Sequence, residues 1–151
     1  MKIYLASDHA GYDLKQIVIR YIKDKGYKFE DLGTFSKESV NWAEYGAKAA
    51  KKVSEDPINT KGIIICGSGM GMSMVSNKFK NVRAALCNDL YSAEMSRKHN
   101  DANVLNMGGR VVGRDLALKI VEKWLNTEYE GGRHQKRIDY LTNEIEKINF
   151  K

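Results

Sequence analysis

A cysteine and a glycine-rich loop stand together in the middle of the chain. Cys66 ends an apolar run, and glycines follow it at the alternate positions 67, 69 and 71. Glycines spaced in this way leave backbone N–H groups free to bind an anion, and a helix that begins there adds its positive end. The G-x-G-x-G spacing is neither the dinucleotide fingerprint nor a P-loop. The stretch favours an anion-binding turn beside a thiol.

The setting of Cys66 favours chemistry at its sulfur. A thiol at the end of a strand that faces a helix N-terminus is stabilised as the thiolate, which could act as a nucleophile or a general base. The alternative is a small core residue, which is the role expected of the second cysteine, Cys87. Two cysteines are too few for a disulfide scaffold, and this favours a reducing compartment.

Two of the three histidines stand beside carboxylates. His9 follows Asp8, and His99 precedes Asn100 and Asp101. A neighbouring carboxylate can orient an imidazole for acid-base chemistry, so a functional role is favoured for both histidines. His134 could equally be a surface residue at a helix start, and it is given no role. Since no cysteine-histidine set has zinc spacing, no metal is expected.

Three arginines have settings that suit a phosphate. Arg110 follows Gly108 and Gly109, and Arg133 and Arg137 are four residues apart, so they share one face of a helix. A guanidinium group binds a phosphate dianion through two parallel hydrogen bonds. The alternatives are a loop salt bridge for Arg110 and an exposed basic face for the other two.

The elements that position these residues are predicted by an alternation of short apolar runs and amphipathic segments. The pattern predicts strands over 3–6, 27–32, 62–66, 82–87 and 102–107, and helices over 11–25, 42–54, 71–77, 89–98, 114–125 and 135–148. Such alternation indicates an α/β fold of three layers, Rossmann-like, in which a five-stranded parallel sheet has helices on both faces and a C-terminal helix. We expect residues 1–151 to form a single domain.

In this class of fold, ligands bind beyond the carboxyl ends of the strands. We therefore expect segments 7–11, 66–71, 99–101 and 108–110 to gather at one edge of the sheet. Asp8, His9 and His99 would then lie near Cys66.

Composition and charge exclude several classes of protein. Hydrophobic residues make up 42% of the 151 residues and charged residues 29%, a globular balance. No apolar run approaches the ~18 residues of a membrane helix, and the N-terminus turns polar too early for a signal peptide, so a cytoplasmic protein without a membrane partner is expected. The net charge of +6 could mean a nucleic-acid partner. Most of it is lysine spread along helices, which is more typical of a solvated face.

The chain resembles the family of ribose-5-phosphate isomerase type B and the galactose- and allose-6-phosphate isomerases. The resemblance rests on motifs that run in family order, namely Ser7-Asp8-His9-Ala10-Gly11, residues 62–73, residues 96–104, Gly109-Arg110-Val111-Val112-Gly113 and residues 130–137. It implies an aldose-ketose interconversion by a proton shift between C1 and C2 through an enediolate, without a cofactor. Ribose 5-phosphate is the expected substrate.

The resemblance also implies a role for each matching residue. Cys66 would move the proton, and His99 would open the sugar ring with Asp8 nearby. The Ser68 hydroxyl and the loop N–H groups would stabilise the enediolate oxygens; the loop residues are Gly67, Ser68, Gly69, Met70 and Gly71. The phosphate would be held by His9, Arg110, Arg133 and Arg137, and the sugar by Asn100. Each site would be shared between subunits of a homodimer or a dimer of dimers.

Two positions depart from the family pattern. Ser68 stands where the family often has threonine, and both carry a hydroxyl. Asn41-Trp42-Ala43 stands where Asp-Tyr-Pro is common, so an aromatic wall is kept and a hydroxyl is lost. A hexose 6-phosphate substrate therefore stays open as an alternative, and a nucleotide- or nucleic-acid-binding protein is a remote one.

Overall fold

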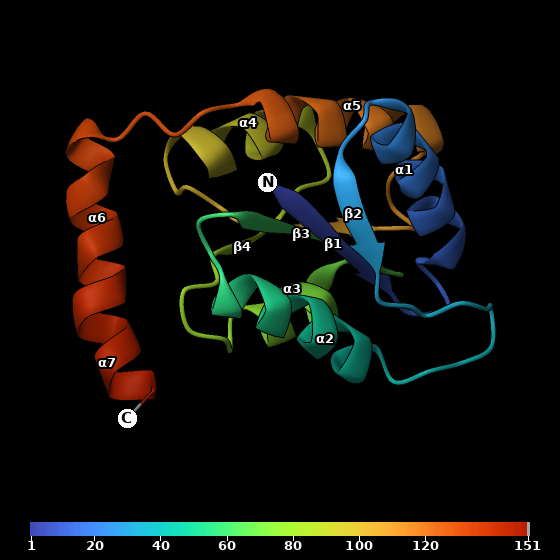
Figure 1. Cartoon of the computed structure of the whole chain (residues 1–151), viewed down its shortest axis with the longest axis horizontal. Helices are drawn as coiled ribbons and strands as arrows, with labels where there is room; N and C mark the ends of the chain where they lie inside the picture. Colours follow the sequence, from blue (N-terminus) through green and yellow to red (C-terminus); the bar gives the residue numbers. More distant parts are fainter. Residues whose placement is uncertain (151) are drawn as a thin grey trace.

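The computed structural model describes residues 1–150 of the chain. Within them, five parallel strands form one sheet in the order β2-β1-β3-β5-β4 (Figure 1). The strands are β1 Lys2–Ser7, β2 Lys28–Asp31, β3 Thr60–Cys66, β4 Ala84–Leu86 and β5 Val104–Gly108. The predicted parallel sheet is confirmed, although β4 is shorter than the predicted 82–87.

Helices cover both faces of the sheet, so the predicted three layers are confirmed. One face carries α1 Tyr12–Asp24, α4 Leu90–Lys98 and α5 Arg114–Asn126, and the other carries α2 Trp42–Glu55 and α3 Met70–Ser76. A C-terminal arm stands beside the sheet, at the left of Figure 1. It consists of a 3-10 turn η1 Gly132–His134, α6 Gln135–Tyr140, a π turn η2 Leu141–Ile145 and α7 Glu146–Asn149.

Local sequence signals explain where several helices begin and end. The Asn41 side chain accepts a hydrogen bond from the N–H of Ala43 at 3.1 Å, so α2 begins at Trp42. The Asp89 side chain accepts from the N–H of Ser92 at 2.7 Å and caps α4 in the same way. Gly26, just after α1, has a φ of +76°, the left-handed conformation that commonly ends a helix.

The central strand β3 divides the core into two clusters. Ile63 and Ile65 pack with Trp124 of α5 on one face, whereas Ile64 and Cys66 pack with the helices α2 and α3 on the other. Successive side chains of a strand point to opposite faces, and both faces of this strand are covered. The near-continuous apolar run in the sequence follows from that double burial.

The strand order places a crevice at one edge of the sheet. From β1 the chain goes to β2 on one side and then returns to β3 on the other, so β1 and β3 diverge beyond their carboxyl ends. The turn after β1 lies against the end of β3 at Gly11, where an added Cβ would be 2.3 Å from the Ile65 carbonyl oxygen. This close approach requires glycine.

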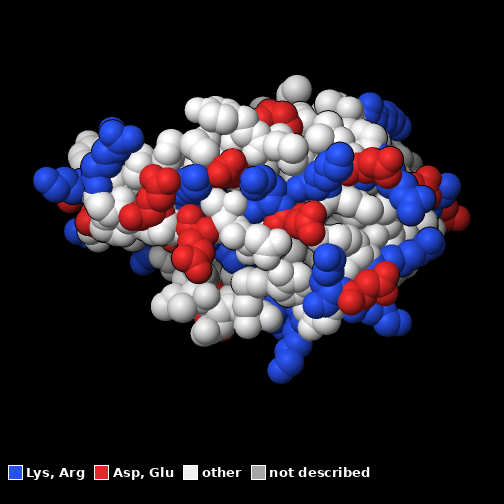
Figure 2. Space-filling model, turned by 90° about the horizontal axis from the view of Figure 1, so that it is seen from above, with Lys and Arg blue, Asp and Glu red and all other residues white. Residues whose placement is uncertain are grey.

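Basic and acidic side chains are mixed on the face that carries α1, α4 and α5. Figure 2 shows them interspersed on that face without a continuous basic stripe. Some are paired, as in Lys98 with Glu94 and Lys25 with Glu122. None of the described helices combines the length and the apolar character that a membrane span requires.

Candidate active site

A hollow of about 410 Å³ opens where β1 and β3 end. Its lining residues are Asp8, His9, Ala10, Trp42, Cys66, Gly67, Ser68, Gly71, Arg110 and Val111. The lining includes most of the site residues predicted in the first two-thirds of the chain, together with Arg110 from the turn after β5. Long-range folding thus brings three separate motifs to one place.

The Cys66 sulfur accepts a hydrogen bond from the backbone N–H of Gly69 at 3.1 Å. Gly69 has a φ of +80°, and a Cβ there would lie 2.4 Å from Leu86 Cδ1, so only glycine fits this turn. This contact fixes the sulfur in a position where Cys66 lines the hollow. Cys87 lies in the core, where it is 1% exposed and burial raises the pKa of its thiol.

Two of the backbone N–H groups predicted to bind the enediolate oxygens form hydrogen bonds within the loop itself. Gly69 donates to the Cys66 sulfur, and Met70 donates to the Ser68 hydroxyl at 3.3 Å. Neither Gly69 nor Met70 lines the hollow, and the Met70 side chain is 57% exposed. The three loop residues that line the hollow are Gly67, Ser68 and Gly71.

Asp8 and His9 are held in place by backbone groups. Asp8 Oδ1 accepts from the N–H of Gly11 at 2.9 Å, and His9 Nδ1 accepts from the N–H of Val40 at 3.3 Å. Because Nδ1 is the acceptor, a neutral His9 ring carries its proton on Nε2 and can donate from there. Val40 was not predicted, since a backbone contact across 31 residues leaves no signal in residue types.

The loop that carries Val40 is anchored by a buried ion pair at its start. The side chain of Lys15 is fully buried and pairs with Asp31 at 2.5 Å. Burial lowers the pKa of Lys15, and Asp31 opposes this shift. Asp31 Oδ1 also accepts from the N–H of Gly33 at 3.0 Å. The loop is thus fixed at both ends, at Gly33 and at Val40.

Trp42 and Arg110 form walls of the hollow. The Trp42 ring packs on Gly71, where an added Cβ would lie 2.9 Å from Trp42 Cε3. Arg110 Nη1 lies 3.7 Å from the position a Cβ would take on Gly67, and among the described residues Arg110 forms no ion pair with a carboxylate. Its guanidinium is thereby left for an anion at the hollow.

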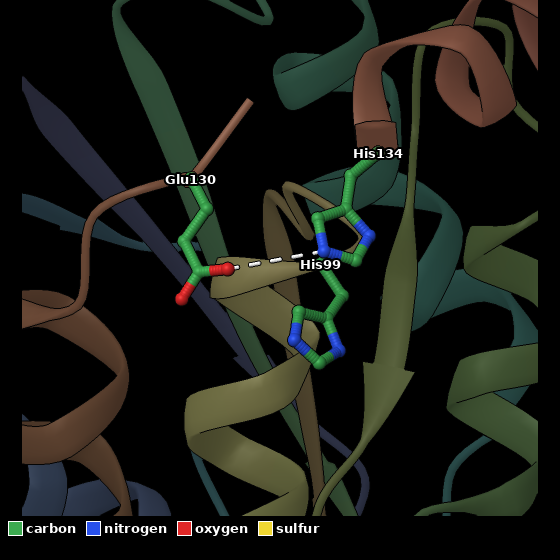
Figure 3. Close-up of side chains that lie close together, drawn as sticks. All are labelled: His99, Glu130 and His134. Atoms are coloured by element: carbon green, nitrogen blue, oxygen red, sulfur yellow. Dashed lines mark ion pairs between the residues drawn. The ribbon is translucent and has the colours of Figure 1, made fainter. Parts of the chain in front are cut away.

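The remaining predicted residues form a second cluster. The rings of His99 and His134 stack with centroids 4.3 Å apart, and Glu130 Oε2 lies 3.8 Å from His134 Nε2 (Figure 3). Arg133 and Arg137 lie at the same ring, with Arg133 Nε 3.5 Å from Nε2 and Arg137 Nη1 3.4 Å from Nδ1. His134 and Glu130 were given no role from the sequence, although both belong to the 130–137 motif.

The prediction that His99 lies beside Cys66 within one chain is wrong. Val104 pairs with Gly62 at the start of β3, whereas Cys66 at its end pairs with Gly108. His99 ends the helix that returns the chain to the start of β5, so it lies at the opposite edge of the sheet. Asn100 also lies away from Cys66, in a hollow of about 450 Å³ between β4 and the C-terminal arm.

Comparisons with known proteins point to one family. The family model described as Ribose/Galactose Isomerase matches residues 3–141. Ribose-5-phosphate isomerase B of Escherichia coli is 43% identical over 141 residues, which are 93% of this chain and 94% of that protein. Ribose-5-P isomerase B of Listeria innocua is 41% identical over 149 residues, 99% of each chain.

Solved structures show the same fold. The structure of Clostridium thermocellum ribose-5-phosphate isomerase B has a TM-score of 0.94 and 46% identity, and covers 98% of this chain and 99% of its own. The Mycoplasma genitalium ribose-5-phosphate isomerase B, solved with bound ribulose 5-phosphate, has a TM-score of 0.94 and 37% identity, with 96% of each chain covered.

Proposed function

We propose, since this chain belongs to the ribose/galactose isomerase family, that it is an aldose-ketose isomerase that interconverts ribose 5-phosphate and ribulose 5-phosphate. The observation that carries the proposal is the Cys66 sulfur, which a backbone N–H holds in a hollow shared with Asp8, His9 and Arg110. A relative with the same fold binds ribulose 5-phosphate, and this supports the choice of substrate.

The reaction moves one proton between C1 and C2, and the hollow holds groups suited to this step. Cys66 as thiolate takes the proton from one carbon and returns it to the other. Gly67, Ser68 and Gly71 face the hollow and stabilise the charge that develops on the enediolate oxygens. His9 and Arg110 bind the phosphate and hold the sugar at the sulfur.

We propose that the second cluster acts in the hollow of another subunit. His99, Asn100, Arg133 and Arg137 lie away from the Cys66 hollow of their own chain, and the ring-opening and phosphate-binding roles require them at the sugar. A homodimer or a dimer of dimers, with each site shared between two chains, brings both halves together. Each chain then contributes one half to each of two sites.

A substrate panel tests this proposal. Proton NMR in deuterated water would follow exchange and turnover of ribose 5-phosphate, allose 6-phosphate and galactose 6-phosphate. We expect turnover of ribose 5-phosphate to be the fastest. Faster turnover of a hexose phosphate would assign the protein to the hexose-6-phosphate isomerases of the same family. No turnover of any of these sugars would refute the proposed isomerase activity.

The cellular setting is part of the same proposal. A reaction on ribose 5-phosphate belongs to the pentose phosphate pathway, and we propose a cytoplasmic location. Binding to DNA or RNA at low salt, with affinity falling steeply as salt rises, would favour the nucleic-acid alternative instead. The mixed charges on the face in Figure 2 give that alternative no support there.

A further inference from the structure

The ring of His99 rests on a second imidazole that the proposed reaction does not use. His99 ends α4, where its backbone N–H donates to the Met95 carbonyl oxygen at 2.9 Å. Its side chain makes no hydrogen bond to another described residue. The contact that orients the ring is the stack on His134, with centroids 4.3 Å apart and planes 13° from parallel.

His134 is held far more firmly than His99. It is 3% exposed, and its backbone N–H donates to the Gly131 carbonyl oxygen at 3.0 Å. Arg133, Arg137 and Glu130 approach its ring nitrogens within 3.8 Å. Figure 3 shows the His134 ring beneath the arm, with the His99 ring lying against it. The better-fixed ring therefore provides a platform for the more exposed one.

The charges around His134 favour its neutral form. Burial lowers its pKa, and so do His99, Arg133 and Arg137, against which Glu130 acts in the other direction. A neutral platform matters because His99 must gain and lose a proton during ring opening. A second positive ring at 4.3 Å would oppose the protonated state of His99.

The arginines at His134 are the ones proposed to bind phosphate. A neutral imidazole has one acceptor nitrogen, whereas both guanidinium groups only donate. Only one arginine can therefore form a hydrogen bond with the ring at a time, which suits the long separations of 3.5 and 3.4 Å. A phosphate accepts from both guanidinium groups and would draw them from the ring nitrogens.

A metal ion is a poorer occupant of this cluster. His99, Glu130 and His134 each offer a ligand atom, and these atoms lie within 4.8 Å of one another. An imidazole binds a metal along the lone pair in its own plane, at about 2.1 Å. Two stacked rings with planes 13° apart do not direct their lone pairs at one point, and two guanidinium groups already face His134.

We propose that His134 is a positioning residue for His99 and links its orientation to the phosphate-binding arginines. The stack holds the His99 ring at the angle needed for proton transfer to the ring oxygen of a cyclic sugar. Arg133 and Arg137 contact the nitrogens of the same ring, so a phosphate that draws these arginines away acts directly on the surroundings of the ring that orients His99. This inference rests on the proposed function through the role given to His99.

Three variants of the full-length protein test it. His134→Leu removes the aromatic platform, His134→Phe keeps a ring without nitrogens, and Gln135→Ala changes the exposed neighbour as a control. Initial rates would be measured with ribose 5-phosphate, which is mainly cyclic, and with open-chain ribulose 5-phosphate. We expect His134→Leu to lower kcat for the cyclic sugar about tenfold or more and for the ketose less than about threefold. His134→Phe should recover most of the loss.

NMR of the His99 ring protons gives a readout that does not depend on turnover. Stacking predicts an upfield ring-current shift in the wild type and in His134→Phe that is lost in His134→Leu. Equal kcat losses with both substrates, a rise in KM alone, or unchanged His99 signals in His134→Leu would overturn the positioning role. A wild type that turns over neither sugar but shows the ring-current shift would refute the proposed function while preserving the stack.

Discussion

Cys66 and His99 lie at opposite edges of one sheet in the same chain. Cys66 ends β3 and pairs with Gly108 at the end of β5. His99 lies in the turn between α4 and β5, close to the start of β5, where Val104 pairs with Gly62. Both residues have proposed roles on a single small sugar. One chain can therefore supply either end of a complete site but not both, and two chains that exchange these ends can supply two complete sites.

Mixing two inactive variants should restore activity. Cys66→Ala and His99→Asn would each damage both sites of a homodimer, but a heterodimer would contain one site with both wild-type residues. If subunits exchange freely at equal amounts, half of the dimers are mixed and about a quarter of the wild-type sites are restored. The ribose 5-phosphate turnover of the mixture measures this.

The control mixes Cys66→Ala with Asp8→Asn, because both residues lie in the same hollow. That mixture should stay inactive, since every site would lack one of the two groups. Recovery in the control, or none in the test mixture after proven subunit exchange, would contradict a shared site.

Replacing Cys66 separates chemistry from binding. Cys66→Ala should lower kcat by about 10²–10⁴-fold, the usual contribution of a positioned general base. A competitive phosphate ligand should bind within about threefold of its wild-type affinity, because Arg110 and His9 keep their backbone contacts. Calorimetry and steady-state rates together check this, and near-normal turnover would refute the role of the sulfur.

Replacing His99 should affect the two directions unequally. His99→Asn removes the group proposed to open the ring, so turnover of the cyclic aldose should fall by about 10²-fold or more. The open-chain ketose needs no ring opening, and its turnover should fall far less. Initial rates in both directions by proton NMR provide the measurement. Equal losses would mean that His99 has some other role.

The ion pair under the active-site loop should be important for stability. Asp31→Asn leaves the fully buried side chain of Lys15 without its partner charge, which should lower the free energy of unfolding by about 3 kcal/mol. Urea unfolding measures this. The control is Glu30→Gln, on the same strand as Asp31, which breaks the partly exposed pair with Lys2 of β1 and should have no measurable effect. Similar losses in both variants would contradict the argument.

Lys61 should make stability depend on pH. The pKa of Lys61 is lowered to about 8, against about 10.4 in an unfolded chain. Burial is the larger cause, and the positive charge of Arg97 is the second. Below pH 8 both states are protonated and the folded state bears the full cost of the buried charge. Between about pH 8 and 10.4 the unfolded chain binds more protons, so this group's contribution to the free energy of unfolding rises with pH.

Lys61→Met should therefore be more stable than the wild type at pH 7, on the order of 2 kcal/mol. The difference should shrink as the pH approaches 10. Urea unfolding at several pH values measures it, with Lys28→Met, at an exposed position, as the control. A difference that stays constant with pH would show that packing, and not charge, causes the effect.

Much of the fold followed from short-range patterns. The apolar run before Cys66 predicted a strand, and the chain places it at the centre of the sheet, where both of its faces are covered. The predicted starts of the helices over 42–54 and 89–98 hold to within a residue, because Asn41 and Asp89 accept hydrogen bonds there from N–H groups only a few residues away. Such contacts are local, so residue type and spacing are enough to predict them.

The same distinction between local and long-range contacts applies to the candidate active site. Residue types and spacing determined that this protein has a thiol beside a glycine turn, histidines beside carboxylates and arginines suited to phosphate. The tertiary structure alone decided which of them meet, because a helix that follows a parallel strand runs back across the sheet and carries His99 to the edge opposite Cys66. It also decided the contacts of Val40 with His9 and of His134 with His99, which join residues through folding and leave no periodic signal in the chain.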